Sequence, residues 1–392
     1  MAERIVLHVG TMKSGTTSMQ ALLYADRAGL AAQGIHAPGE RWEDQVRAVR
    51  DVLARADGKG ETWARLAAEA RDWEGTVVYS MEYLGTFTPR QASAVASTFA
   101  PTPVEVVITF RDLNRTLTSM WQETIQNGRA WSWDEFLAGA RATRAGHSTT
   151  ARRARRVVRA VHRRLPGEVA RRVQPAISWA LPSAAGDNFW HQHDVVRIAR
   201  VWAEVVGEEN VTLVAVPGPG SSPDALTARF GEVVGFDPAT VPATPRDNSS
   251  LGAASIQVLQ QMNQRLEAAG IAWDAGREVR KFALAKQILR RRTTSEQRIG
   301  LTVSPWVRAE SQWREQQLRT TRMRFVGDWS DLDPVDVAGV DPSATPSAEL
   351  IAVAQFGFEA LVAEHGLDRT WTQTSDPSVA IDALAALVRD LL

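Results

Sequence analysis

Three features are missing from this 392-residue chain: cysteine, a long apolar run and an excess of charge of one sign. Without cysteine, disulfides, thiolate metal sites and cysteine nucleophiles are excluded, and a reducing cytoplasm is the expected location. No apolar run approaches the roughly 20 residues that span a bilayer, and the N-terminus lacks the apolar core of a signal peptide. Because the net charge is zero, no overall charge attracts nucleic acid. We therefore expect no membrane span and no nucleic-acid partner, while the oligomeric state stays open.

The stretch IVLHVGTMKSGTTSMQALL, residues 5–23, predicts a buried strand, a glycine-rich turn and a helix from Ser18. Gly10 and Gly15 allow a tight turn, and the first N–H groups of a helix have no partner within it. The turn also carries one positive charge and three hydroxyls, from Lys13, Ser14, Thr16 and Thr17. Such a turn favours a bound phosphate or sulfate.

The turn departs from the loop that binds nucleotide triphosphates, which has the form G-x-x-x-x-G-K-[ST]. Gly10 and Gly15 have the required separation, but Thr16 stands at the lysine position and Lys13 lies inside the loop. A P-loop-type kinase or phosphotransferase is therefore one alternative, and a non-catalytic nucleotide-binding protein is another. The plainest alternative is an ordinary turn with a solvated lysine.

The K-S-G-T-T core after a strand resembles the first motif of the sulfotransferases that use 3′-phosphoadenosine 5′-phosphosulfate (PAPS). The longer HVGTMKSGTTSMQ is most similar to the bacterial, carbohydrate-type branch of that family. The resemblance implies an α/β fold like that of P-loop NTPases, with a three-layer parallel sheet flanked by helices and with helical insertions. It implies PAPS as co-substrate, 3′-phosphoadenosine 5′-phosphate (PAP) as product, a hydroxylated acceptor and no metal. The implied nucleotide-binding residues of the loop are Lys13, Ser14, Gly15, Thr16 and Thr17, with Lys13 also catalytic.

A second strand is expected over residues 76–84, and Glu82 stands where it should end. Ligands of open α/β sheets bind at the carboxyl ends of the strands. The family resemblance places a catalytic glutamate just after the second strand, which makes Glu82 the candidate general base for the acceptor hydroxyl. Alternatively, Glu82 caps or pairs with the helix that follows. His36, in GIHAPGE, is the rival base and a candidate substrate-binding residue.

A third strand is expected within VEVVITFRDLNRTLTSMWQETIQNG, residues 104–128, and Arg111 closes it. Ser119 follows about two helical turns later, within reach of a phosphate that Arg111 could also bind. The resemblance implies that both residues bind the 3′-phosphate of the nucleotide. The alternative for Arg111 is a structural salt bridge. Trp121 and Gln122 resemble a W-Q-E element of bacterial members and are candidates for positioning the acceptor.

The rest of the chain carries weaker signals. Arginines dominate residues 141–172, within an expected helical insertion over 141–186 that is either a lid for anionic ligands or a solvated addition. Trp190 and His193 are candidates for facing the acceptor, with a place in the core as the alternative.

The expected domains are a sulfotransferase catalytic domain over residues 1–335 and a helical extension over 336–392. No His, Asp or Glu cluster suggests a metal. GDWSDL, residues 327–332, has no evident role.

Overall fold

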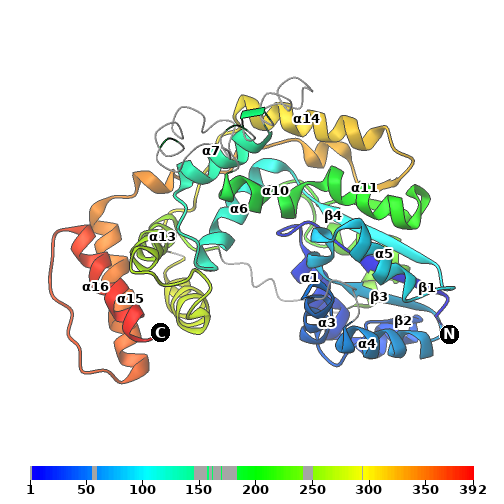
Figure 1. Cartoon of the computed structure of the whole chain (residues 1–392), viewed down its shortest axis with the longest axis horizontal. Coiled ribbons are helices and arrows are strands. Elements are labelled where there is room, and N and C mark those ends of the chain that lie inside the picture. Colours follow the sequence, from blue (N-terminus) through cyan, green and yellow to red (C-terminus); the bar gives the residue numbers. More distant parts are fainter. Residues whose placement is uncertain are drawn as a thin grey trace. The chain divides into compact units, whose positions relative to one another are not determined.

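The computed structural model describes residues 2–54, 60–144, 157–158, 161, 169, 183–241, 250–293 and 295–392 (Figure 1). They form two compact units, each assembled from three segments of the chain. Unit 1 consists of Met1–Thr116, His191–Asp247 and Pro305–Pro334. Unit 2 consists of Leu117–Trp190, Asn248–Ser304 and Val335–Leu392. The predicted domain boundary after residue 335 stays a prediction, and most of the predicted insertion lies outside the described residues.

Unit 1 contains a six-stranded sheet, counted over the described residues, in the order β2-β3-β1-β4-β5-β6. Every pair of neighbouring strands is parallel. The strands are β1 (Arg4–His8), β2 (Ile35–His36), β3 (Thr76–Ser80), β4 (Val104–Phe110), β5 (Val211–Ala215) and β6 (Arg324–Val326). The predicted α/β class with a parallel sheet is thus confirmed.

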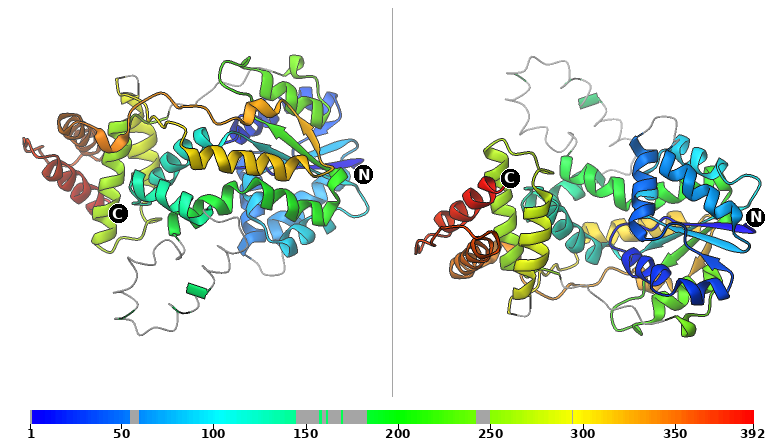
Figure 2. Two further views of the ribbon diagram at one scale, coloured as in Figure 1. Left: turned by 90° about the horizontal axis from the view of Figure 1, so that it is seen from above. Right: turned by 90° about the horizontal axis from the view of Figure 1, so that it is seen from below.

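Helices cover both faces of this sheet, because successive strand residues point to opposite sides. In β1, Ile5 and Leu7 belong to one apolar core and Val6 to the other. The first core is covered by α3 (Trp42–Ala54), α4 (Glu61–Asp72), α5 (Pro89–Ser97), α11 (Val195–Val206) and α14 (Pro305–Arg319). The second is covered by α1 (Thr16–Ala25), α2 (Arg27–Ala32) and α12 (Ala225–Val234). This is the expected three-layer arrangement (Figure 2).

Two details of unit 1 differ from the sequence expectations. The strand expected over 76–84 ends at Ser80, because the chain turns at Met81 into the 3₁₀-helix η1 (Glu82–Thr86). Residues 324–326, where no strand is predicted, form the edge strand β6. This strand has three residues, and only Val326 is buried, so its apolar pattern is too short to be recognised.

GDWSDL has a structural role. Its last four residues form the 3₁₀-helix η7 (Trp329–Leu332). Within it, Asp331 pairs with Arg229 of α12 at 2.7 Å and accepts a hydrogen bond from the Gly218 N–H at 2.8 Å. The segment therefore ties the end of β6 to α12 and to the loop after β5.

The main regular elements in the described part of unit 2 are helices. Its helices include α7 (Trp133–Arg144), α13 (Ala253–Ala268), the π-helix η5 (Glu278–Ile288), α15 (Ser347–His365) and α16 (Pro377–Asp390). Two further helices have residues in both units: α6 (Leu113–Gln126) and α10 (Ala184–His193). Gly357 of α15 allows close packing, since a Cβ there would lie 3.1 Å from Leu284 and 3.6 Å from Leu384.

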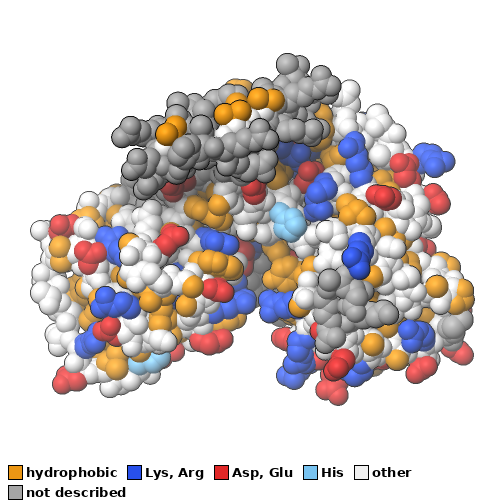
Figure 3. All heavy atoms as spheres, viewed as in Figure 1, with side chains coloured by type: hydrophobic (Ala, Val, Ile, Leu, Met, Phe, Trp, Pro, Cys, Tyr) orange, Lys and Arg blue, Asp and Glu red, His pale blue; other side chains and the backbone are white. Residues whose placement is uncertain are grey.

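Charged side chains of both signs are interspersed over the face seen in Figure 3, in keeping with the zero net charge. Among the helices that the structure describes, none has the length and apolar character needed to cross a membrane.

Candidate anion-binding and catalytic site

The turn between β1 and α1 has an unusual backbone. Gly10 and Gly15 have φ of 45° and 84°, and Lys13 between them has φ of 62°. Lys13 is the one non-glycine residue with positive φ in the described part of the chain. The φ of Gly15 favours glycine, and a Cβ there would lie 2.3 Å from Leu226 Cδ2, the end of a side chain that would have to move. A side chain in the left-handed region is held there by its surroundings, and such positions cluster at functional sites.

A series of hydrogen bonds joins this turn to the strands of the sheet. The Ser14 hydroxyl must donate to the Thr11 carbonyl, because a carbonyl oxygen only accepts. Ser14 Oγ then accepts from Thr109 Oγ1 at 2.9 Å, and Thr109 Oγ1 accepts from His8 Nε2 at 3.0 Å. His8 Nδ1 in turn accepts from Ser80 Oγ at 2.8 Å. The network thus assigns His8 as a neutral imidazole with its proton on Nε2.

This arrangement changes the role expected of Ser14. The residue is fully buried and its hydroxyl is committed to the base of the turn. Burial lowers the pKa of His8 to about 3, so the imidazole that anchors these hydrogen bonds is neutral at physiological pH. An anion above the turn would therefore meet the backbone N–H of Ser14, with its side chain serving as support.

The other predicted loop residues differ in exposure, because the Thr16 side chain is buried and those of Lys13 and Thr17 are not. Lys13 and Thr17 are exposed, and Thr16 and Thr17 are the first two residues of α1. Within the described residues, the N-cap Gly15 provides no side-chain cap for this helix. The N-terminal N–H groups and the positive end of the helix dipole are thus directed at the space above the turn.

Arg111 follows β4, the neighbour of β1, and its Nη1 donates to the Lys13 carbonyl at 3.2 Å. Burial, followed by the nearby Arg115, lowers the pKa of Arg111 to about 10. Asp112 is paired with Arg115 instead. Within the described residues Arg111 forms no salt bridge, and its buried Nε has no hydrogen-bond partner. The structural salt bridge considered for Arg111 is therefore not observed, and its guanidinium retains capacity for an anion.

Ser119, the predicted partner of Arg111, lies on α6, is partly buried and belongs to unit 2. Shared binding of one phosphate by Arg111 and Ser119 stays a prediction.

Glu82 is oriented by α1, the helix that follows the turn. Gln20 Nε2 donates to Glu82 Oε2 at 2.7 Å and to the Ser80 carbonyl at 3.1 Å. Glu82 is partly exposed and begins η1, directly after β3. A Cβ on Gly85 of η1 would lie 3.4 Å from the Gly10 carbonyl, so η1 packs beside the turn. The carboxylate is thus fixed near the turn while remaining open to solvent.

His193, the last residue of α10, is fully buried in unit 1. Burial lowers its pKa to about 3, and the charges of Arg314, Arg111 and Lys13 act in the same direction. Its imidazole is therefore neutral and lies in the same electrostatic environment as the two predicted cations of the site.

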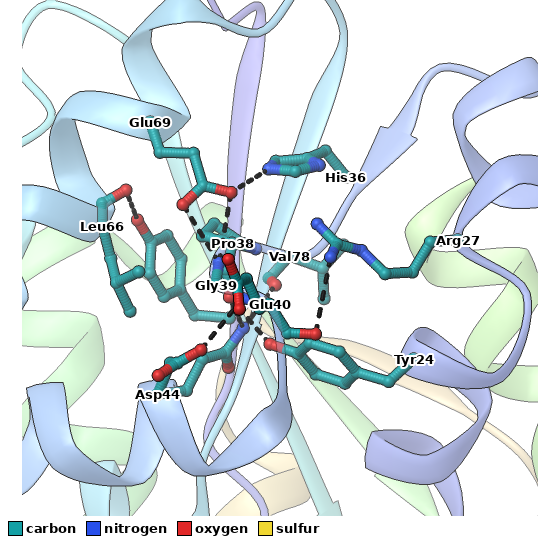
Figure 4. A network of polar contacts seen from close by, with 12 residues as sticks. Tyr24, Arg27, His36, Pro38, Gly39, Glu40, Asp44, Leu66, Glu69 and Val78 are labelled. Carbon is teal, nitrogen blue, oxygen red and sulfur yellow. Dashed lines mark hydrogen bonds and ion pairs between the residues drawn. The ribbon is translucent and has the colours of Figure 1, made fainter.

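His36 takes part in a separate polar network at the edge of the sheet (Figure 4). Its Nε2 lies 2.9 Å from Glu69 Oε1, and its ring stacks on Trp73 with centroids 4.9 Å apart. Glu69 also accepts from the Gly39 N–H. These contacts give His36 a structural role and offer no support for a role as base.

Three predicted acceptor contacts lie in unit 2. Trp121 and Trp190 are buried, and their indole N–H groups donate to the carbonyls of Trp131 at 3.0 Å and Ala140 at 2.8 Å. Gln122 is 8% exposed. All three side chains are as buried as core residues. A place in the core is the alternative considered for Trp190.

Four residues of the site were not predicted from the sequence: His8, Gln20, Thr109 and Arg314. A signal was available for two of them, because His8 and Thr109 are polar residues next to apolar residues of buried strands. A buried polar side chain requires a hydrogen-bonding partner, so such interruptions indicate a network. No comparable pattern singled out Gln20 or Arg314. Over the described ranges, no group of three or more His, Asp or Glu side chains could hold a metal ion.

Comparison with known proteins adds little. No model of a protein family and no curated protein matches the chain. Among solved structures, it is similar to the crystal structure of a sulfotransferase from Alicyclobacillus acidocaldarius, with 14% identity and a TM-score of 0.34. The similarity covers 67% of this chain and 94% of that one. A likeness this distant does not establish the function.

Proposed function

We propose that this chain is a sulfotransferase that moves the sulfuryl group of PAPS directly to a hydroxyl of a small-molecule, sugar or lipid acceptor. One observation carries the proposal: the Lys13 turn and Arg111 follow adjacent parallel strands and are joined by the 3.2 Å hydrogen bond between Arg111 Nη1 and the Lys13 carbonyl. Two cations at neighbouring strand ends suit a ligand with separated anionic groups, as in a 3′,5′-bisphosphate nucleotide.

The chemistry needs positioning and charge neutralisation more than covalent participation, as in phosphoryl transfer. The acceptor oxygen forms a bond to sulfur while the bond from sulfur to the 5′-phosphate oxygen breaks, and PAP leaves. Lys13 and the N–H groups of the turn neutralise the leaving oxygen. Glu82, held by Gln20, takes the acceptor's proton.

The rival proposal, a P-loop-type kinase or phosphotransferase, needs an acid for Mg²⁺ near the phosphates. Asp112, the acid directly after β4 and Arg111, is buried and paired with Arg115. Its engagement favours the metal-independent sulfuryl transfer, which on this proposal takes place in the cytoplasm.

The proposal is tested by incubating the full chain with sulfur-labelled PAPS and a mixture of alcohols, phenols, sugars and lipids, with and without a metal chelator. We expect label in an organic product and stoichiometric PAP, both unaffected by the chelator. Consumption of ATP in Mg²⁺ without any use of PAPS would instead establish the kinase alternative.

A further inference from the structure

Unit 1 contains a cavity of about 250 Å³ beside Arg111, between the start of α6, the helix α14 and the end of η7. In Figure 1, α14 is the long helix drawn in yellow. The cavity wall includes an apolar part formed by Phe110, Leu113, Leu318, Leu332 and Pro334. Its polar part includes three arginines, Arg111, Arg308 and Arg314. The volume is below the range of about 300–1,000 Å³ for drug-sized ligands, so the cavity suits one group of a ligand or a small ion.

Two buried donors at this cavity have no partner within the described part of the chain. One is Arg111 Nε and the other is Ser311 Oγ of α14. Both residues line the same cavity, so a single group in it could accept from both. Burying such groups without a partner costs about 1–3 kcal/mol each, which is the reason that buried donors are normally satisfied.

The charges around the cavity favour an anion. Of its three acidic lining residues, Asp112 is paired with Arg115 and Glu315 with Arg319 at 2.7 Å. Asp333 is exposed. The three lining arginines thus face a cavity in which two of the three carboxylates are already neutralised.

We propose that this cavity is an anion subsite that takes a phosphate-type group, with Arg111 Nε and Ser311 Oγ as its donors and Arg308 as a further charge. The group belongs either to the bound nucleotide or to a separate molecule, namely inorganic phosphate or an anionic acceptor. The possibility that the nucleotide supplies this group rests on the proposed function, whereas the subsite itself does not.

The test uses Ser311→Ala, which removes one donor and little volume, with Arg308→Gln as a second variant. Arg322→Gln is the matched control, because Arg322 is an exposed arginine of unit 1 outside the cavity. Calorimetry would measure PAP and 5′-AMP binding, and thermal unfolding would measure stabilisation by inorganic phosphate. The wild-type preference for PAP over 5′-AMP reports separately on the proposed function.

If the nucleotide supplies the group, Ser311→Ala weakens PAP binding roughly tenfold or more and leaves 5′-AMP binding unchanged. If a separate anion supplies it, PAP binding is unchanged but stabilisation by inorganic phosphate is reduced in both cavity variants and retained in Arg322→Gln. The proposal is overturned if both cavity variants match the control in every assay, because the cavity then holds only water.

Discussion

Two arginines, the buried Arg280 of unit 2 and the partly buried Arg111 of unit 1, are held in opposite ways. In unit 2, the Nη atoms of Arg280 donate to five acceptors: the carbonyls of Gly128, Ala272, Trp273 and Ala275 and the side-chain oxygen of Asn263. In unit 1, Arg111 donates to one acceptor in the described part of the chain, the Lys13 carbonyl. Burial is the largest cause that lowers the pKa of each.

The difference teaches how to separate a structural arginine from a binding one. A guanidinium has five N–H donors, and a folded protein satisfies most of them where the residue only supports the fold. At Arg280 the protein supplies acceptors to both Nη atoms, and Nε alone has no partner among the described residues. At Arg111 the only acceptor among the described residues is the Lys13 carbonyl, and the side chain lines a cavity beside the glycine-rich turn. Substitutions near Arg111 should therefore affect activity or binding, and substitutions at Arg280 should affect stability.

The largest effect is expected for Glu82→Gln, which keeps the size of the side chain and removes the base. Transfer to an alcohol should fall by ~10²–10⁴, the usual contribution of a positioned base, while PAP affinity stays near wild type. Transfer to a phenol should fall less, since a phenol loses its proton more readily. Full activity on alcohols, measured with labelled PAPS, would remove Glu82 from the mechanism and leave His193 as the next candidate.

Lys13→Ala should lower turnover by ~10²–10³, the effect of losing one donor to the leaving oxygen. PAP binding should fall less, because charge develops on that oxygen only during transfer. The free energy of unfolding should not decrease, since alanine removes no buried side chain here. Turnover equal to wild type would make Lys13 a surface residue.

Arg280→Ala should give the opposite pattern to Glu82→Gln and Lys13→Ala. Losing the contacts to the Gly128 carbonyl and Asn263 should lower the free energy of unfolding by about 3 kcal/mol, as is usual when a buried hydrogen-bond network is broken. Denaturant titration measures this, with the exposed Arg291→Ala as control. A stability equal to that of the control would break the distinction between the two arginines.

A smaller effect is expected at Thr109, which links His8 to Ser14 below the turn. Thr109→Val keeps the shape but leaves His8 Nε2 and Ser14 Oγ without this partner, so we expect a loss of about 1–3 kcal/mol in the free energy of unfolding. Thr109→Ser retains the hydroxyl and should recover most of that loss. Nitrogen NMR of His8 should show the proton on Nε2 in wild type. A proton on Nδ1 would refute the direction assigned to these hydrogen bonds.

The sequence predicted the parts of unit 1 that depend on local pattern. The apolar run before Gly10 and the one before Arg111 are long enough to identify β1 and β4, and the glycines identify the turn. The support of the turn depends on strand register, which places His8 of β1 beside Ser80 of β3. That pairing joins residues far apart in the chain, so no local pattern contains it.

His36 and Trp121 also show that a local sequence pattern does not identify the partner of a side chain. A histidine in a glycine-rich loop and a tryptophan on a helix each suit a binding site or a structural role. Only their partners, Glu69 for His36 and the Trp131 carbonyl for Trp121, distinguish the two. The tertiary fold brings Glu69 to His36, and Trp131 lies in the segment after α6, the helix that carries Trp121.

The most direct test of the central claim is calorimetry of PAP and 5′-AMP on wild type and Arg111→Ala, without metal. We expect wild type to bind PAP far more tightly than 5′-AMP. Arg111→Ala should weaken PAP binding by ~1.5–3 kcal/mol, the range for a hydrogen bond to a charged group, and leave 5′-AMP binding unchanged. Equal weakening of both nucleotides, or no weakening of either, would contradict the assignment of Arg111 to the 3′-phosphate.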